Sequence, residues 1–211
     1  FITLAFTVSS CKEDDPVAAQ TTYVLSVKDV LGVSGTATFV ETTNTTTTIN
    51  IVLNGSPSGT HPAELSIGSA VENRKAAYVL NPVDGTGKSS TVVNSSYKEL
   101  IEYDGSIKVF KSSLEPTIIL AIGDIGGNVM TTTKKSYTLQ KVGLYGVSGT
   151  ALFEKRSNGN TLLTITLTGT ISGEFYPATI NIGSTSTVGG GDIKKTLNGV
   201  PISTSVSIKT R

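Results

Sequence analysis

The six-residue stretch Gly-Val-Ser-Gly-Thr-Ala occurs twice in this chain, at residues 32–37 and again at residues 146–151. The two copies are 146 − 32 = 114 residues apart. A chain of 211 residues is long enough for two domains of about a hundred residues each. The repeat therefore constrains the fold, because the second half of the chain is expected to form the same structure as the first.

The spacing between the copies extends well beyond these six residues. Matching residues recur at an offset of 114 and, towards the end of the second copy, at an offset of 115, which one inserted residue explains. We expect residues 23–70 and 137–184 to form matching strands, joined through a short polar linker at residues 129–136. The matching pairs are Tyr23 and Tyr137, Phe39 and Phe153, Gly55 and Gly169, Gly59 and Gly173, Pro62 and Pro177, and Gly68 and Gly183.

The local pattern of both repeats is that of β-structure. Ile49, Ile51 and Leu53 alternate with polar residues, which is the period of a half-buried strand. Thr- and Val-rich runs favour strands, and Gly favours the tight turns between them. The sequence predicts an all-β fold of two tandem antiparallel Greek-key-like β-sandwich repeats, residues 23–130 and residues 137–211.

One short helix is expected within the first repeat, at residues 96–103. Ser96 is a candidate N-cap, and Glu99 follows three residues later, which is the spacing of a capping box. This helix belongs to residues 97–128, a stretch that has no counterpart in the second repeat.

The second repeat is therefore expected to be incomplete, because a sandwich without its last strands exposes a sheet edge and an apolar face. Three explanations are open at this point. The chain continues past Arg211, the second repeat packs its open side against the first, or a partner donates a strand.

The N-terminal residues resemble the end of a bacterial lipoprotein signal peptide. The apolar run at residues 1–8 is too short to span a membrane as a helix, and small residues separate it from Cys11, the only cysteine. By this resemblance residues 1–10 are signal peptide, Cys11 is acylated, and residues 11–22 form a lipidated tether. The alternative is a buried strand that ends in Cys11.

The charged stretch at residues 12–15, Lys-Glu-Asp-Asp, resembles the export signal of surface lipoproteins of the Bacteroidetes group. It implies an outer-membrane protein that is lipid-anchored and faces the cell exterior. Several acyl chains on one cysteine anchor a protein firmly in a membrane, since each buried CH₂ contributes about 0.8 kcal/mol to the binding free energy. The alternative is a solvated charged linker.

Gly87-Lys88-Ser89 has the ending of a phosphate-binding loop. That loop also needs a glycine five residues before Gly87, where this chain has Pro82, and a helix after it, where residues 91–93 have a strand pattern. We therefore expect a hairpin turn built on Asp84 and Gly85.

Four motifs, in order, resemble the chordin-type (CHRD) domain family, a β-sandwich related in shape to copper/zinc superoxide dismutase. The resemblance covers residues 23–128 fully and residues 137–211 in part. The motifs are Gly-Val-Ser-Gly-Thr-Ala with the following Phe39, the loop Gly59-Thr60-His61-Pro62-Ala63, the run Tyr103-Asp104-Gly105-Ser106-Ile107-Lys108-Val109, and Ala121-Ile122-Gly123-Asp124-Ile125-Gly126.

The family resemblance implies histidines that alternate along the strand after the glycine loop, as metal ligands do in the dismutase. Here that strand carries Glu64 and Ser66, and only His61 is kept. Phe110 and Tyr176 stand where further imidazoles are expected. A copper or zinc site needs several imidazoles or thiolates around one point. We therefore expect no metal centre and no cofactor.

Three residues remain as weak ligand-site candidates: His61, Asp124 and Tyr176. We expect His61 to be a hydrogen-bonding loop residue and Asp124 to form the Gly-Asp-Ile-Gly turn. A hard-ion site from Asp and backbone carbonyls stays open, although no calcium-loop motif marks one. Tyr176 could join Tyr103 and Tyr145 in a small sugar-stacking surface.

The functional expectation is a non-enzymatic, lipid-anchored surface protein with a binding or structural role. A net charge of +1 and 16% charged residues give no reason to expect a nucleic-acid partner. One alternative is an assembly subunit that polymerises by β-strand addition, as lipidated pilins do. A degenerate dismutase-like metalloenzyme is a weaker one. The expected partners are the membrane, through the anchor, and a protein or second copy at an open sheet edge.

Overall fold

A computed structural model describes residues 17–72, 75–142, 146–171, 174–186, 190–197 and 199–200, and the backbone of the strand at residues 206–210. The expected signal peptide, Cys11 and the charged stretch after it lie outside the described residues. Within the described residues, no helix has the length and apolar character needed to cross a membrane.

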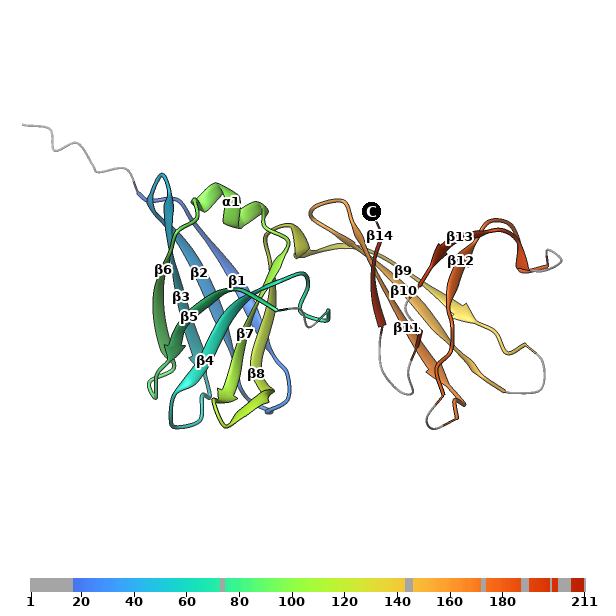
Figure 1. The fold of residues 1–211 in the computed structure, drawn as a ribbon, viewed down its shortest axis with the longest axis horizontal. Coiled ribbons are helices and arrows are strands. Elements are labelled where there is room, and N and C mark those ends of the chain that lie inside the picture. The colour runs from blue at the N-terminus through green and yellow to red at the C-terminus, as the bar shows by residue number, and fades with distance from the viewer. Residues whose placement is uncertain are drawn as a thin grey trace, which may run out of the picture.

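The first domain is a sandwich of eight antiparallel strands and one short helix (Figure 1). The strands follow the order β5-β4-β7-β8-β1-β2-β3-β6, so the β7–β8 hairpin lies between β4 and β1. The elements are β1 (Gln20–Val27), β2 (Ser34–Thr43), β3 (Thr46–Asn54), β4 (His61–Ile67), β5 (Ala76–Val83), β6 (Lys88–Val93), α1 (Tyr97–Glu102), β7 (Gly105–Ser112), β8 (Glu115–Ile125) and the 3₁₀ turn η1 (Gly126–Asn128).

The sheet curls until its two end strands, β5 and β6, lie side by side. The Asn81 side-chain amide donates to the Ser90 carbonyl at 2.7 Å, and the Asn81 backbone N–H donates to Thr91 Oγ1 at 2.8 Å. The inward side chains of the two layers then form one core, in which Tyr23 meets Phe39 edge to face at 5.2 Å between ring centroids. The expected all-β sandwich is confirmed.

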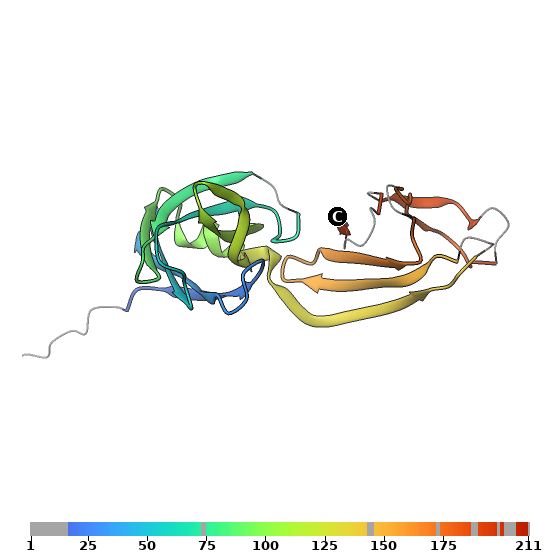
Figure 2. The same ribbon diagram turned by 90° about the horizontal axis from the view of Figure 1, so that it is seen from below.

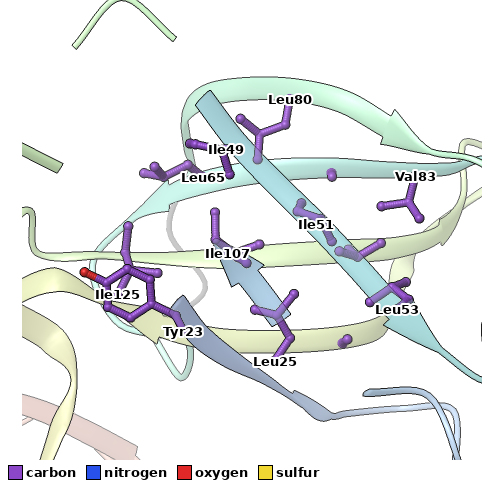
Figure 3. Packing of buried hydrophobic residues seen from close by; sticks show 14 of the residues in the cluster. Tyr23, Leu25, Ile49, Ile51, Leu53, Leu65, Leu80, Val83, Ile107 and Ile125 are labelled. Carbon is purple, nitrogen blue, oxygen red and sulfur yellow. The ribbon is translucent and has the colours of Figure 1, made fainter. Parts of the chain in front are cut away.

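The hairpin of β7 and β8 supplies a large part of this core. Figure 3 shows Ile107 from β7 and Ile125 from β8 in the same cluster as Tyr23 and Leu25 from β1. The buried apolar residues that the hairpin contributes are Ile107, Val109, Leu120, Ala121 and Ile125. Removing such side chains typically costs 2–5 kcal/mol each, so the first domain depends on this hairpin.

The expected helix is confirmed, and it has the expected cap. Ser96 Oγ accepts from the Glu99 N–H at 3.3 Å, and Glu99 Oε2 accepts from the Ser96 N–H at 3.0 Å. The hydrogen bond from the Ser96 amide is the main reason why the pKa of Glu99 lies below its ordinary value. The helix buries Leu100 against the first core.

In the described residues of the second domain, six strands form two groups, which can be followed in Figure 1. One sheet has the order β14-β11-β10-β9, and a separate pair joins β12 to β13. The strands are β9 (Met130–Leu139), β10 (Ser148–Arg156), β11 (Thr161–Thr168), β12 (Thr179–Asn181), β13 (Ile193–Thr196) and β14 (Val206–Thr210). Figure 2 shows the pair on the opposite side of a space from the four-stranded sheet.

The two domains share the pairing register of their first three strands, not only the order. Tyr23 lies opposite Ala37, and Ala37 lies opposite Ile51. In the second domain Tyr137 lies opposite Ala151, which lies opposite Ile165. Tyr137, Ala151 and Ile165 each lie 114 positions after their counterparts in the first domain. The sequence repeat is therefore also a structural repeat over these strands.

The prediction that residues 129–136 form a linker between the domains is wrong, because most of these residues belong to a strand. Residues 130–136 are the first part of β9, where Ser136 pairs with Leu152 and Lys135 with Phe153 in β10. Their polar side chains are exposed, so they show no alternation that would reveal a strand. Their backbone pairs with β10 regardless, and the second domain begins at residue 130.

A matched pair of glycines tests the duplication directly. A Cβ added to Gly35 would lie 2.1 Å from the Val52 carbonyl oxygen, and one added to Gly149 would lie 2.0 Å from the Thr166 oxygen. We expect Gly35→Ala and Gly149→Ala each to lower the free energy of unfolding of its own domain by about 1–3 kcal/mol, because the strands must move apart. Urea denaturation followed by domain-resolved NMR measures this.

The controls change the next residue of each strand, Thr36→Ser and Thr150→Ser. Their effect is expected to stay below about 1 kcal/mol, the whole span of strand propensities. If Gly149→Ala is tolerated while Gly35→Ala is not, the two strands are not equivalent.

Candidate functional site

A groove lies between the two groups of strands of the second domain. It has a volume of about 910 Å³ and is lined on one side by β9, β10 and β11 and on the other by β12 and by Leu197, which follows β13. Its apolar lining consists of Tyr137, Leu139, Ala151, Phe153, Leu163, Ile165, Ile180 and Leu197. Along β9 the lining residues Lys135, Tyr137 and Leu139 are two positions apart, so they lie on the same face of the strand.

The groove leaves one part of a face exposed that is covered in the first domain, although Ala151, Leu163 and Ile165 of this face are buried. Tyr23 is 8% exposed, whereas its counterpart Tyr137 is 54% exposed. Both rings make the same edge-to-face contact with a phenylalanine, and for Tyr137 and Phe153 the centroids are 5.7 Å apart. The two faces are therefore built alike, and they differ in what covers them.

The rim of the groove carries positive charge from two strands. Lys134 and Lys135 on β9 and Lys155 on β10 line it, and Lys135 Nζ lies 5.8 Å from the centre of the Tyr137 ring. A cation at this distance from an aromatic face is weakly attracted to it. The groove thus combines an apolar floor with a basic edge.

His61 begins β4 and is buried, with 2% of its surface exposed. Its Nδ1 lies 2.6 Å from the Lys111 carbonyl oxygen, and its Nε2 lies 2.9 Å from the Pro57 carbonyl oxygen. A metal-binding imidazole must present an unprotonated nitrogen to the ion, whereas both nitrogens here face carbonyl acceptors. His61 is hydrogen-bonded as expected, but it lies in β4 and not in a loop.

The strand positions that the family resemblance gives to imidazoles hold a different polar group. Ser66 Oγ donates to Glu64 Oε1 at 2.6 Å, and Lys108 Nζ lies 3.5 Å from the same oxygen. Lys108 is 1% exposed. A buried ammonium beside the carboxylate repels a metal cation, so these residues do not fit a copper or zinc site. Within the described residues, no three His, Cys, Asp or Glu side chains cluster in a way that could hold a metal ion.

Asp124 is not the turn former that its motif predicts. It lies inside β8, where its Oδ1 accepts from the Ala70 backbone N–H at 2.7 Å and its Oδ2 accepts from Arg156 Nη1 at 2.7 Å. The prediction was wrong because β8 continues through Ile125 and the turn comes only with η1. The side chain is thereby engaged on both oxygens.

The Asp124–Arg156 ion pair joins the two domains. Arg156 ends β10, and its side chain is 4% exposed, against 15% for Asp124. The same Nη1 donates to the Asn128 carbonyl, and the Ser157 backbone N–H donates to the Val129 carbonyl at 2.9 Å. The hairpin turn after Arg156 is therefore fastened to the end of the first domain.

Sequence reasoning missed Arg156, although the repeat contains a signal for it. The equivalent position of the first repeat is Thr42, in a run rich in threonine. The second repeat keeps the asparagine of this turn, Asn44 and Asn158, but changes Thr42 to arginine. Asn158 donates through its side chain to Asp104 and through its backbone N–H to the Gly127 carbonyl at 3.1 Å. The change from Thr42 to Arg156 at equivalent positions of the two repeats thus marks a residue that has a role in the second repeat only.

Two of the tyrosines expected to form a stacking surface, Tyr103 and Tyr176, belong to different hydrophobic clusters. Tyr176 packs against the second core, its backbone bridges to Val200, and its hydroxyl oxygen accepts from the Ile171 N–H at 2.8 Å. Tyr103 caps α1 and packs against the first core, where burial raises its pKa. Tyr145 lies outside the described residues. The two described rings therefore serve different domains.

The segment with the Gly-Lys-Ser ending forms the expected turn at Asp84 and Gly85, but the flanking strands β5 and β6 lie at the two ends of the strand order and do not pair as a hairpin. Asp84 Oδ1 accepts from the Thr86 hydroxyl at 2.6 Å and from the Thr86 and Lys88 backbone N–H groups. These bonds, led by the Thr86 hydroxyl, lower the pKa of Asp84. Lys88 is already in β6, so no helix follows the turn.

The chain matches no known family model, no curated protein and no solved structure.

The junction gives a quantitative prediction. We expect Arg156→Ala to lower the free energy of unfolding by about 3–5 kcal/mol, because it leaves the carboxylate of Asp124 buried and unpaired. The matched control is Lys111→Ala, which removes an exposed pair with Glu115 (39% and 41% exposed) and is expected to cost at most about 1 kcal/mol.

Differential scanning calorimetry measures both variants. Arg156→Ala is also expected to separate the unfolding of the two domains into distinct transitions. Equal, small losses in the two variants would show that the ion pair does not fasten the domains.

Proposed function

We propose that this protein is a non-enzymatic surface protein, anchored by acyl chains on Cys11, whose two β-sandwich domains serve a binding or structural role. The chordin-type resemblance and the lipoprotein-like N-terminus support this proposal from the sequence. The observation that carries it in the structure is the buried junction between the domains.

The junction supports a display role because it fixes the second domain at a distance from the tether. The described chain enters the first domain at the side facing away from the second domain (Figure 1). The pair of Asp124 and Arg156 then holds the second domain at the opposite end. A lipid anchor followed by two rigid domains would present the groove away from the membrane surface.

The engagement of the candidate chemical groups supports a non-enzymatic role. His61 faces two backbone carbonyls, and Asp124 binds Ala70 and Arg156. A general base must be able to reach the proton of a substrate. In this structure these side chains stabilise the fold instead.

A second candidate function is assembly by β-strand addition, and the open groove favours it. Among the strands that the structure describes, β9 and β12 each have a paired strand on one side only, β10 and β13 respectively. Open strand edges beside an apolar face are the features that strand-addition assemblies use.

The proposed anchor predicts a specific modification. In bacterial cells that make the whole chain, we expect mass spectrometry to find Cys11 as the first residue, carrying acyl chains. Cys11→Ser is expected to leave the protein unprocessed and to remove it from the detergent-extracted membrane fraction. Ser10→Ala, which keeps a small residue before the cysteine, is the matched control and is expected to be acylated. An unmodified N-terminus that includes residues 1–10 would remove the membrane proposal.

A further inference from the structure

We propose that the groove of the second domain binds a single-chain amphiphile with an anionic head group, a carboxylate or a phosphate. The head group lies at the lysine-bearing end of the groove, and the alkyl chain lies along the apolar floor. This inference gives a ligand class to the binding role proposed above and rests on that role. It does not depend on the lipid anchor, whose test at Cys11 is separate.

The groove changes from basic to apolar along the strands that form its floor. Lys155 on β10 pairs with Thr161 on β11, and the next row places Lys135 on β9 opposite Phe153. Beyond Lys135 the same face of β9 continues with Tyr137 and is apolar. The lining residues that the structure describes include no Asp or Glu. The charge is therefore of one sign and lies at one end, which is the arrangement that orients an amphiphile.

The basic end of the groove is a property of the second repeat alone. The three positions that carry lysine in the second repeat carry uncharged or acidic residues in the first: Lys134, Lys135 and Lys155 stand where the first repeat has Gln20, Thr21 and Glu41. The floor is the same in both, since Tyr137 and Phe153 repeat Tyr23 and Phe39. The second repeat thus differs from the first by positive charge beside a shared apolar face.

Protection of a sheet edge explains only part of this charge. Lysines on an edge strand discourage pairing with other sheets, which accounts for Lys134 and Lys135 on β9. Lys155 lies on β10, which has β9 on one side and β11 on the other, so it guards no edge. The ion pairs among the described residues do not involve these lysines. A carboxylate or phosphate in the groove would give them an anionic partner.

The apolar floor has the dimensions of an alkyl chain. A strand rises about 3.4 Å per residue, so the floor from Lys135 to Leu139 extends for about 14 Å, close to the extended length of a decyl chain. The groove volume of about 910 Å³ lies within the range of small-ligand sites. Tyr137 is 54% exposed at the middle of this floor, and an alkyl chain over it would remove apolar surface from water.

An extended peptide is a weaker match for the charges. A peptide that adds to the sheet pairs with the free edge of β9. Lys155 lies on the other side of β9, one strand further in, and a peptide on the edge leaves it out of reach. A ligand between the two groups of strands contacts β9 and β10 together. The lysines on both strands therefore favour an occupant inside the groove.

The test measures the binding of decyl compounds to the full chain of residues 1–211 by isothermal titration calorimetry. Decanoate and decyl phosphate carry the anionic head group, decanol is uncharged, and decyltrimethylammonium is cationic. Both anionic compounds are expected to bind several-fold more tightly than decanol, and the cationic compound more weakly, because the head groups meet lysines. Raising the salt concentration is expected to narrow these differences. Equal affinities, or no binding of the anionic compounds, would overturn the proposal and leave the acylation of Cys11 to be judged on its own.

Lysine variants locate the head group. A protein with both Lys135→Gln and Lys155→Gln is expected to bind decanoate several-fold more weakly, because exposed ion pairs contribute modestly, and to bind decanol unchanged. The matched control is Lys194→Gln, which changes an exposed lysine of β13, a strand that does not line the groove. This control is expected to bind decanoate as the unchanged protein does. If the double variant binds decanoate as tightly as the control, these lysines do not hold the head group and the proposal fails.

Tyr137 reports where the alkyl chain lies. It is expected to react readily with tetranitromethane in the free protein, and several-fold more slowly with saturating decanoate, while the buried Tyr23 is protected in both cases. Peptide mapping assigns the nitrated residue. Decanoate that binds without protecting Tyr137 would contradict the proposed site. So would concentration-dependent dimers, detected by sedimentation velocity, in which Tyr137 is protected without any amphiphile.

Discussion

The row of backbone pairing from Tyr23 through Ala37 to Ile51 is the constraint on which the rest of the structure depends. It places the alternating apolar residues of three strands on one face, and a slip of one residue would turn all of them outward. The same row recurs in the second domain. Once it is fixed in both, the positions of the following strands in each layer are largely determined.

Much of the fold could be predicted because its signals are local. Alternation at Ile49, Ile51 and Leu53 indicates a strand, and Ser96 with Glu99 indicates a capped helix, without knowledge of distant residues. The strand at Met130–Leu139 could not be predicted over its first half, because its exposed polar residues have no buried face to set a period. Pairing with β10 alone makes it a strand.

The site could be predicted only in part, because its decisive contacts join residues far apart in sequence. Asp124 looks like a turn residue in its own motif, and only the approach of Arg156, 156 − 124 = 32 positions later, gives it a partner. The groove also depends on residues far apart in sequence. In the first domain β7 and β8 lie between β4 and β1, whereas the described part of the second domain has no strand between their counterparts β12 and β9.

Amide hydrogen exchange in β4 and β12 tests the central claim most directly, namely that the two domains share one design and that the second is open where the first is closed. In the described part of the chain, β4 has a neighbouring strand on both sides, and β12 has one on one side only. For monomeric protein spanning residues 12–211, we predict slow exchange throughout the middle of β4. In β12, slow exchange is predicted only for amides that face β13, with fast exchange for those that face the groove. Equal protection of the two edges of β12 in the monomer would contradict this account.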